Sequence, residues 1–352
     1  MINCCQKEQN IDIRIINKYN KSIILGIEIL RTYMCFSIVI LHFLKEQFQN
    51  NFLTKFIFHC QPFYVPTFFL ISFYFSFKTF ASKKKNINKI KERFIRIIIP
   101  YIIWPILLWS RNILVNYKNI KFDYILFKAI FFQLLIGYDF YAVFWFQFDL
   151  IVITIIITII IFSFNNCYDI IFKIAFLFFY IINKKYEEKL SIYKQIGSIK
   201  PLLSSFIYSL TGFFLGSKSI LKKFNKKKYM IFMFLVPAIF LIFIHKELIN
   251  FSIRFRIIVI NIVITFLFII FGIMPFDYIN NTLLIKIIKQ ITSFTGGIYY
   301  IHYGVRTIFS TYFKIFDIGD LKSCLINYLV CYFICYLGSI IFINSYLRFL
   351  FI

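Results

Sequence analysis

Long apolar runs, each close to the length that crosses a bilayer, recur along the whole chain and restrict it to few folds. A membrane-spanning helix needs about 20 mostly apolar residues. About ten runs of roughly 17 to 25 residues meet this need, at 22–44, 56–77, 97–115, 141–164, 167–182, 201–217, 230–245, 257–274, 291–313 and 323–345. Because lipid offers backbone groups no hydrogen-bond partner, such runs form helices. The sequence predicts an all-α, polytopic integral membrane protein, a bundle of about ten transmembrane helices.

The number of spans depends most on the fourth and fifth runs. The fifth run is short, and Asn165–Asn166 forms a tight junction between the two. Nine spans, or a re-entrant segment in this region, is the alternative. Two connections, 117–133 and 280–290, are mixed enough in polarity to form interfacial helices.

Composition separates this chain from soluble nucleic-acid-binding proteins. Of its 352 residues, 60% are hydrophobic and 16% are charged, which is typical of a polytopic membrane protein. The net charge of +25 comes from short basic blocks between apolar runs. This pattern predicts anionic lipid head groups, and no nucleic acid, as partners. The eight cysteines form no Cys-x-x-Cys or Cys/His cluster, so no metal site is predicted.

The basic blocks also predict orientation. With ten spans, the blocks at 83–96 and 222–228 lie on the same side as the basic N-terminal segment, 1–21. The positive-inside rule makes that side cytoplasmic, so both termini are expected in the cytoplasm. The plasma membrane is the expected location, although the charge pattern does not itself specify the membrane. The basic connection 184–200 is a counter-example. Residues 22–352 are expected to form a single transmembrane domain.

The first apolar run carries an acid, a guanidinium and an imidazole. Ionisable groups are costly in lipid and usually functional. Arg31 and His42 are eleven positions apart, so they share nearly one helix face, roughly 16 Å apart along the axis. Glu28 lies one turn before Arg31 and can pair with it. The alternative is that Arg31 extends to the head groups and His42 marks the far end of the span.

Arg93 and Arg96 stand immediately before the third run. Arginines three apart at a helix entrance project to one side, where their planar guanidinium groups can bind phosphates. The alternative is that both only contribute to the positive-inside charge.

Further polar residues lie within later runs. Pro62 and Pro66 are expected to bend or break the second span, and Ser72 follows them. Trp145 opens the fourth run and is most simply an interfacial belt residue, whereas Asp149 inside it is a functional candidate.

The ninth run combines glycines with polar aromatic residues. Tyr299, His302 and Arg306 are spaced to share one helix face. Gly296–Gly297 permits close helix packing. A structural role for His302 is the alternative to a catalytic one.

Taken together, these motifs resemble the membrane acyltransferase 3 family. The run Ile27–Arg31 followed by His42 is similar to the family's first helix. Later motifs follow the family's order: Phe68–Ser72, Trp145–Phe146, Ile298–His302, and Arg93-x-x-Arg96 leading into Ile99–Tyr101. Three positions depart from the family pattern: Phe73 replaces a usual glycine, Met34 replaces a small residue, and Tyr303–Gly304 replaces a common proline.

The resemblance implies transfer of an acyl group, most simply acetyl, from cytoplasmic acyl-CoA to a hydroxyl of a surface glycan or glycolipid. Acyl-CoA is then a donor substrate and not a permanently bound cofactor. His42 is expected to act as general base, because imidazole is suited to taking a proton near neutral pH. Glu28 and Arg31 would orient the site or stabilise charge on the thioester oxygen.

The remaining candidates are assigned to the substrates. Arg93 and Arg96 would bind the CoA phosphates. The substrate pocket would be lined by His302, Tyr299, Ser72 and Trp145. Two other functions compete with this one: a polysaccharide or small-molecule exporter without transferase activity, and an inactive relative that only scaffolds partners.

Overall fold

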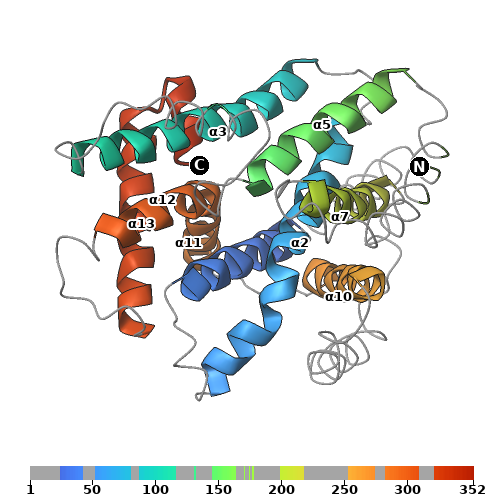
Figure 1. The fold of residues 1–352 in the computed structure, drawn as a ribbon, viewed down its shortest axis with the longest axis horizontal. Coiled ribbons are helices and arrows are strands. Elements are labelled where there is room, and N and C mark those ends of the chain that lie inside the picture. Colours follow the sequence, from blue (N-terminus) through green and yellow to red (C-terminus); the bar gives the residue numbers. More distant parts are fainter. Residues whose placement is uncertain are drawn as a thin grey trace, which may run out of the picture.

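The computed structural model is helical throughout the part of the chain that it describes (Figure 1). It describes residues 24–42, 52–80, 87–115, 145–163, 199–217, 253–273, 282–308 and 321–352, with isolated helical positions at 131, 170, 174 and 177. An N-terminal helix, Ile24–His42, comes first. It is followed by α2 (Phe52–Phe80), α3 (Ile87–Val115), α5 (Trp145–Ser163), α7 (Ile199–Ser217), α10 (Ile253–Ile273), α11 (Thr282–Ser293), α12 (Thr295–Ile308), α13 (Leu321–Ile341) and the 3-10 helix η4 (Tyr346–Leu350).

The described helices confirm the predicted all-α fold. The N-terminal helix and α2, α5, α7, α10 and α13 each begin and end within about a turn of a predicted run. Within the described ranges, three helices are long and apolar enough to cross a membrane: Ile24–His42, Trp145–Ser163 and Lys322–Ile341. The run 230–245 lies outside the described residues. So does the N-terminal segment 1–21.

Two predicted helix boundaries are wrong. The run 291–313 is not one helix, because a turn at Phe294 separates α11 from α12. There the Thr292 hydroxyl donates to the Lys289 carbonyl and the Thr295 hydroxyl to the Thr292 carbonyl, both at 3.0 Å. Such local bonds compete with a continuous helix. The second error is in α3, which begins at Ile87 and not near residue 97.

The prolines do not break their helices. Helix α2 continues through Pro62 and Pro66, and α3 contains Pro100 and Pro105. Of the predicted bend or break in the second span, the break does not occur. Neighbouring helices and hydroxyl side chains can compensate for the lost backbone bonds in membrane helices.

Helices α2 and α7 form the tightest pair in the core. A Cβ atom at Gly212 of α7 would overlap the backbone carbonyl of Leu70 in α2, and one at Gly216 would lie 2.8 Å from the Phe77 Cβ. Two polar contacts extend this packing. Ser205 of α7 donates to the Asp149 carboxylate of α5 at 2.9 Å, and Asn261 of α10 donates to the Thr211 hydroxyl at 2.9 Å.

Most hydroxyl groups inside the helices are satisfied by their own helix. Thr67, Ser76, Thr154 and Ser209 each donate to the carbonyl four residues earlier, at 2.6 to 2.7 Å. This pairing removes the cost of an unsatisfied donor in an apolar environment. The side chains that instead bond to other helices are therefore informative about the site.

The segment after α13 folds back onto the bundle. Ser345 caps η4 by accepting from the Leu347 amide at 3.0 Å. The Trp104 indole of α3 then donates to the Leu350 carbonyl at 3.3 Å. Phe351 and Ile352 lie so close to α12 that a Cβ at Gly297 would be 2.5 Å from the Phe351 carbonyl oxygen. The ninth-run glycines therefore accommodate this C-terminal segment, 343–352, which lies beside α3 and α12 (Figure 1).

Replacing Gly212 with valine tests the α2–α7 contact. The added side chain must displace the Leu70 backbone, and overpacking of a core typically costs about 1–3 kcal/mol. We expect Gly212→Val to lower the thermal unfolding midpoint of the detergent-purified protein. Ser163→Val adds bulk at an exposed position of α5 and should leave the midpoint unchanged. Equal midpoints for the two variants would show that the close contact is absent.

Candidate functional site

A central cavity of about 500 Å³ lies where the N-terminal helix, α2, α3, α5, α12 and the C-terminal segment meet. Its polar lining consists largely of residues singled out from the sequence: Glu28, Arg31, Ser72, Arg93, Arg96 and Tyr299. These residues come from four helices: the first three described helices, which follow one another in the chain, and α12, which comes much later. The rest of the lining is mainly apolar and aromatic, including Phe68, Phe146 and Phe349. A mostly apolar cavity with a few converging polar groups is the usual form of a small-molecule site.

Arg31 connects the N-terminal helix to the junction of α11 and α12. Its Nη2 donates to the Thr292 carbonyl at 2.7 Å, at the C-terminal end of α11. A cation is favourable there because the last carbonyls of a helix carry partial negative charge. One turn further along, the Cys35 thiol donates to the Thr295 carbonyl at 3.3 Å. Arg31 thus positions the start of α12 as well as lining the cavity.

Glu28 shares the cavity wall with Arg31, as the helical spacing predicted. The Arg31 Nε is buried and has no hydrogen-bond partner among the described residues. Part of this guanidinium therefore remains available to a ligand in the cavity.

Arg93 extends from α3 across to α2. Its Nη2 donates to the Ser72 hydroxyl at 3.1 Å, and its Nη1 lies 3.5 Å from the Ser72 carbonyl oxygen. The guanidinium lies 5.2 Å from the centre of the Phe73 ring. Burial lowers the pKa of Arg93 to about 10, and the neighbouring charge of Arg96 also lowers it. The group therefore stays cationic at neutral pH, and its buried Nε has no partner within the described helices.

Arg96 lies on the same side of α3 but is exposed. Its guanidinium lies 5.2 Å from the centre of the Phe349 ring, within the range of a cation–π contact. The predicted pair thus divides into one enclosed arginine and one at the cavity rim. Both line the central cavity, which is the arrangement that the three-residue spacing predicted.

Tyr299 connects the cavity to a pair of histidines. It is buried in α12, with its ring centre 5.6 Å from that of Phe146 and 5.9 Å from that of His302. The His302 and His42 rings are 5.1 Å apart. His302 is fully buried, and neither of its ring nitrogens has a hydrogen-bond partner among the described residues.

The histidine pair does not line the central cavity. His42 ends the N-terminal helix, whereas Arg31 faces the cavity from the same helix. The predicted separation of Arg31 and His42 along one helix agrees with this arrangement. Tyr299 is the cavity residue that contacts the pair through His302.

Besides the histidine pair, two further sequence candidates lie apart from the cavity. Trp145 is half-buried against the hydrophobic core, and the neighbouring Phe146 lines the cavity in its place. Asp149 is fully buried and accepts from Ser205, which joins α5 to α7. Among the described residues, no cluster of three or more His, Cys, Asp or Glu side chains is placed to hold a metal ion.

Sequence reasoning missed the contribution of the C-terminal segment. Phe349 and Ile352 form part of the cavity wall. In the sequence, Gly296 and Gly297 indicate that some segment packs closely on α12, but they do not identify it as the C-terminal segment. Phe146 was also missed, although it stands beside Trp145 in the sequence.

Comparison with known families agrees with this picture. A family model described as an acyltransferase domain, that of the acyltransferase 3 family, matches residues 24–345. Searches of curated proteins and of solved structures find no match. The family is one of polytopic membrane proteins, as the apolar helices also indicate. The chain belongs to the acyltransferase 3 family of membrane acyltransferases.

Proposed function

We propose that the protein transfers an acyl group, most simply acetyl, from cytoplasmic acyl-CoA to a hydroxyl of a surface glycan or glycolipid. The observation that carries this proposal is the convergence of Arg31, Arg93 and Arg96 on one cavity, which connects through Tyr299 to the histidine pair. An anionic donor fits the arginines. A hydroxyl acceptor fits the imidazoles.

The arginines support the donor assignment. Guanidinium groups bind phosphates through paired, charge-assisted hydrogen bonds. Arg93 is fixed by Ser72 and stacked on Phe73, so little side-chain entropy is lost when an anion binds. With the N- and C-termini in the cytoplasm and the protein in the plasma membrane, this end of the cavity faces the cellular supply of acyl-CoA.

The histidine pair supports the acceptor assignment. A buried polar group without a partner is costly, and such groups usually mark a missing ligand or water. The two ring nitrogens of His302 meet this description. A substrate hydroxyl that reaches one of these nitrogens would also lie beside His42, because the two rings are 5.1 Å apart, and the acceptor would then be next to a base.

The reaction follows from this placement. The acceptor oxygen attacks the thioester carbonyl carbon while His42 takes the hydroxyl proton. The carbon–sulfur bond then breaks, and the proton passes to the leaving thiolate, which departs as CoA. Arg31 and Glu28 position the start of α12, and the available Arg31 Nε faces the donor molecule in the central cavity.

Incubation of the purified protein with acetyl-labelled acetyl-CoA and candidate glycans tests the proposal. We expect the label to move to the glycan, because donor and acceptor groups converge in one bundle. Mass spectrometry of surface glycans from cells with and without the gene identifies the acceptor. An exporter without transferase activity leaves all of the label on CoA, and that result would contradict the proposal.

The variant His42→Ala tests the base. Loss of a general base typically lowers a rate by roughly 10²–10⁴-fold. We expect transfer to fall by this amount, while CoA binding and the amount of protein in membranes stay unchanged. Tyr33→Phe alters an exposed side chain on the same helix and should retain full activity. A His42→Ala variant with the wild-type rate would refute the assignment.

The variant Arg93→Ala tests donor binding. A hydrogen bond to a charged group contributes about 1.5–3 kcal/mol, so the dissociation constant for CoA should rise by roughly tenfold or more. Isothermal titration of the detergent-purified protein measures this change. Lys289→Ala removes an exposed cation that does not line the cavity, and it serves as control. Unchanged CoA affinity in Arg93→Ala would contradict the donor-binding role and would mean that Arg93 only contributes to the positive-inside charge.

A further inference from the structure

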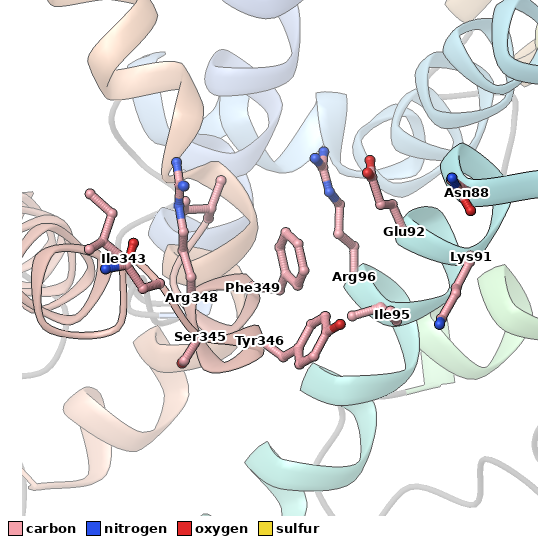
Figure 2. A pocket seen from close by; sticks show the side chains of 12 residues that line it. Asn88, Lys91, Glu92, Ile95, Arg96, Ile343, Ser345, Tyr346, Arg348 and Phe349 are labelled. Atoms are coloured by element: carbon pink, nitrogen blue, oxygen red, sulfur yellow. The ribbon is translucent and has the colours of Figure 1, made fainter. Parts of the chain in front are cut away.

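A second cavity of about 740 Å³ opens beside the central one (Figure 2). It lies between the first turns of α3 and the C-terminal segment 343–352. One wall carries Asn88, Lys91, Glu92, Ile95 and Arg96, and the other carries residues of the C-terminal segment that include Tyr346, Arg348 and Phe349. We call it the outer cavity.

The two cavities share part of their walls. Arg96, Phe349 and Ile352 line both of them. The Arg96 guanidinium lies over the Phe349 ring, 5.2 Å from its centre, so this stacked pair borders both cavities. A ligand held by Arg93 in the central cavity can therefore extend past Arg96 into the outer cavity.

The outer cavity has an excess of positive charge. Lys91, Arg96 and Arg348 line it together with one side-chain carboxylate, that of Glu92, and with Ile352, the last residue of the sequence. Figure 2 shows the Arg348 and Arg96 side chains extending in the same direction with the Phe349 ring between them, whereas Lys91 points away from them. Two guanidinium groups on one side of a cavity form a suitable contact for phosphate.

The C-terminal segment is held in place before any ligand binds. Trp104 donates to the Leu350 carbonyl, Ser345 caps η4, and Phe351 packs against Gly297 and Gly338. Arg348 is therefore presented by a fixed element. Preorganisation of this kind lowers the entropy cost of binding.

We propose that the outer cavity binds the nucleotide end of the acyl-CoA donor, with Arg348 contacting its ribose 3′-phosphate opposite Arg96. This inference rests on the proposed acyl-CoA donor. The shared wall supports it, because one extended molecule can fill both cavities with its phosphates at the arginines and its thioester near Tyr299. The exposed ring of Tyr346 offers a surface for stacking the adenine base.

Binding of CoA and of 3′-dephospho-CoA to the full-length protein tests the inference. The protein is purified in neutral detergent without anionic lipid, and each ligand is titrated calorimetrically. We expect the wild type to prefer CoA. In Arg348→Ala, CoA affinity should fall roughly five- to tenfold, to the level of dephospho-CoA. Arg348→Lys should recover part of the preference because it retains the charge.

Two controls separate this effect from general loss of charge or fold. Lys286→Ala removes an exposed cation of α11 and should leave both affinities unchanged. Acetyl-pantetheine lacks the nucleotide, so its affinity should be the same in the wild type and in Arg348→Ala. A fall for acetyl-pantetheine would indicate a disturbed central cavity and would contradict a specific phosphate contact.

The outcomes distinguish this inference from the proposed function. If Arg348→Ala keeps the wild-type preference for CoA, the outer-cavity inference is overturned and the donor proposal stands. If the wild type binds no CoA, the donor proposal itself fails. The other source of phosphate is a lipid head group, and it is tested by titration with phosphatidylglycerol dissolved in the same neutral detergent. Suppose that Arg348→Ala weakens lipid binding but leaves the preference for CoA over dephospho-CoA unchanged. That result would assign the cavity to lipid head groups and overturn the inference.

Discussion

The hydrogen bond from Arg31 to the Thr292 carbonyl is the interaction on which the geometry of the site depends. A guanidinium in an otherwise apolar helix must find acceptors, because an unpaired charge in such surroundings is costly. Its acceptor, Thr292, lies in the last turn of α11, and α12 begins at Thr295. The direction of α12 then determines where Tyr299 and His302 lie. One polar contact thus connects the cavity lining to the histidine pair.

The structure gives a physical reason for one departure from the family pattern, Phe73. The family usually has glycine where this chain has Phe73. Here the Phe73 ring is fully buried and lies beneath the Arg93 guanidinium at 5.2 Å. A cation–π contact of this kind contributes about 0.5–2 kcal/mol, depending on desolvation. The larger residue therefore supports an arginine of the proposed donor site and does not obstruct it.

The sequence predicted the helical fold and most of the polar lining of the central cavity, because both depend on local spacing. Helix periodicity placed Glu28 with Arg31 and Arg93 with Arg96. It did not predict the break at Phe294, which depends on threonine hydroxyls and on an arginine far away in the chain. Nor did it distinguish Phe146 from Trp145, because a shift of one residue along a helix turns the side chain by about 100°.

The Arg31–Thr292 contact also sets an order of events during biosynthesis. Its two residues are separated by 261 positions. At about 5–20 residues per second, the ribosome needs on the order of tens of seconds to make the intervening chain. The N-terminal helix is thus inserted long before its acceptor exists, and the site is completed only when α11 and α12 arrive. A nascent chain stalled before residue 292 carries an arginine that still lacks its native partner.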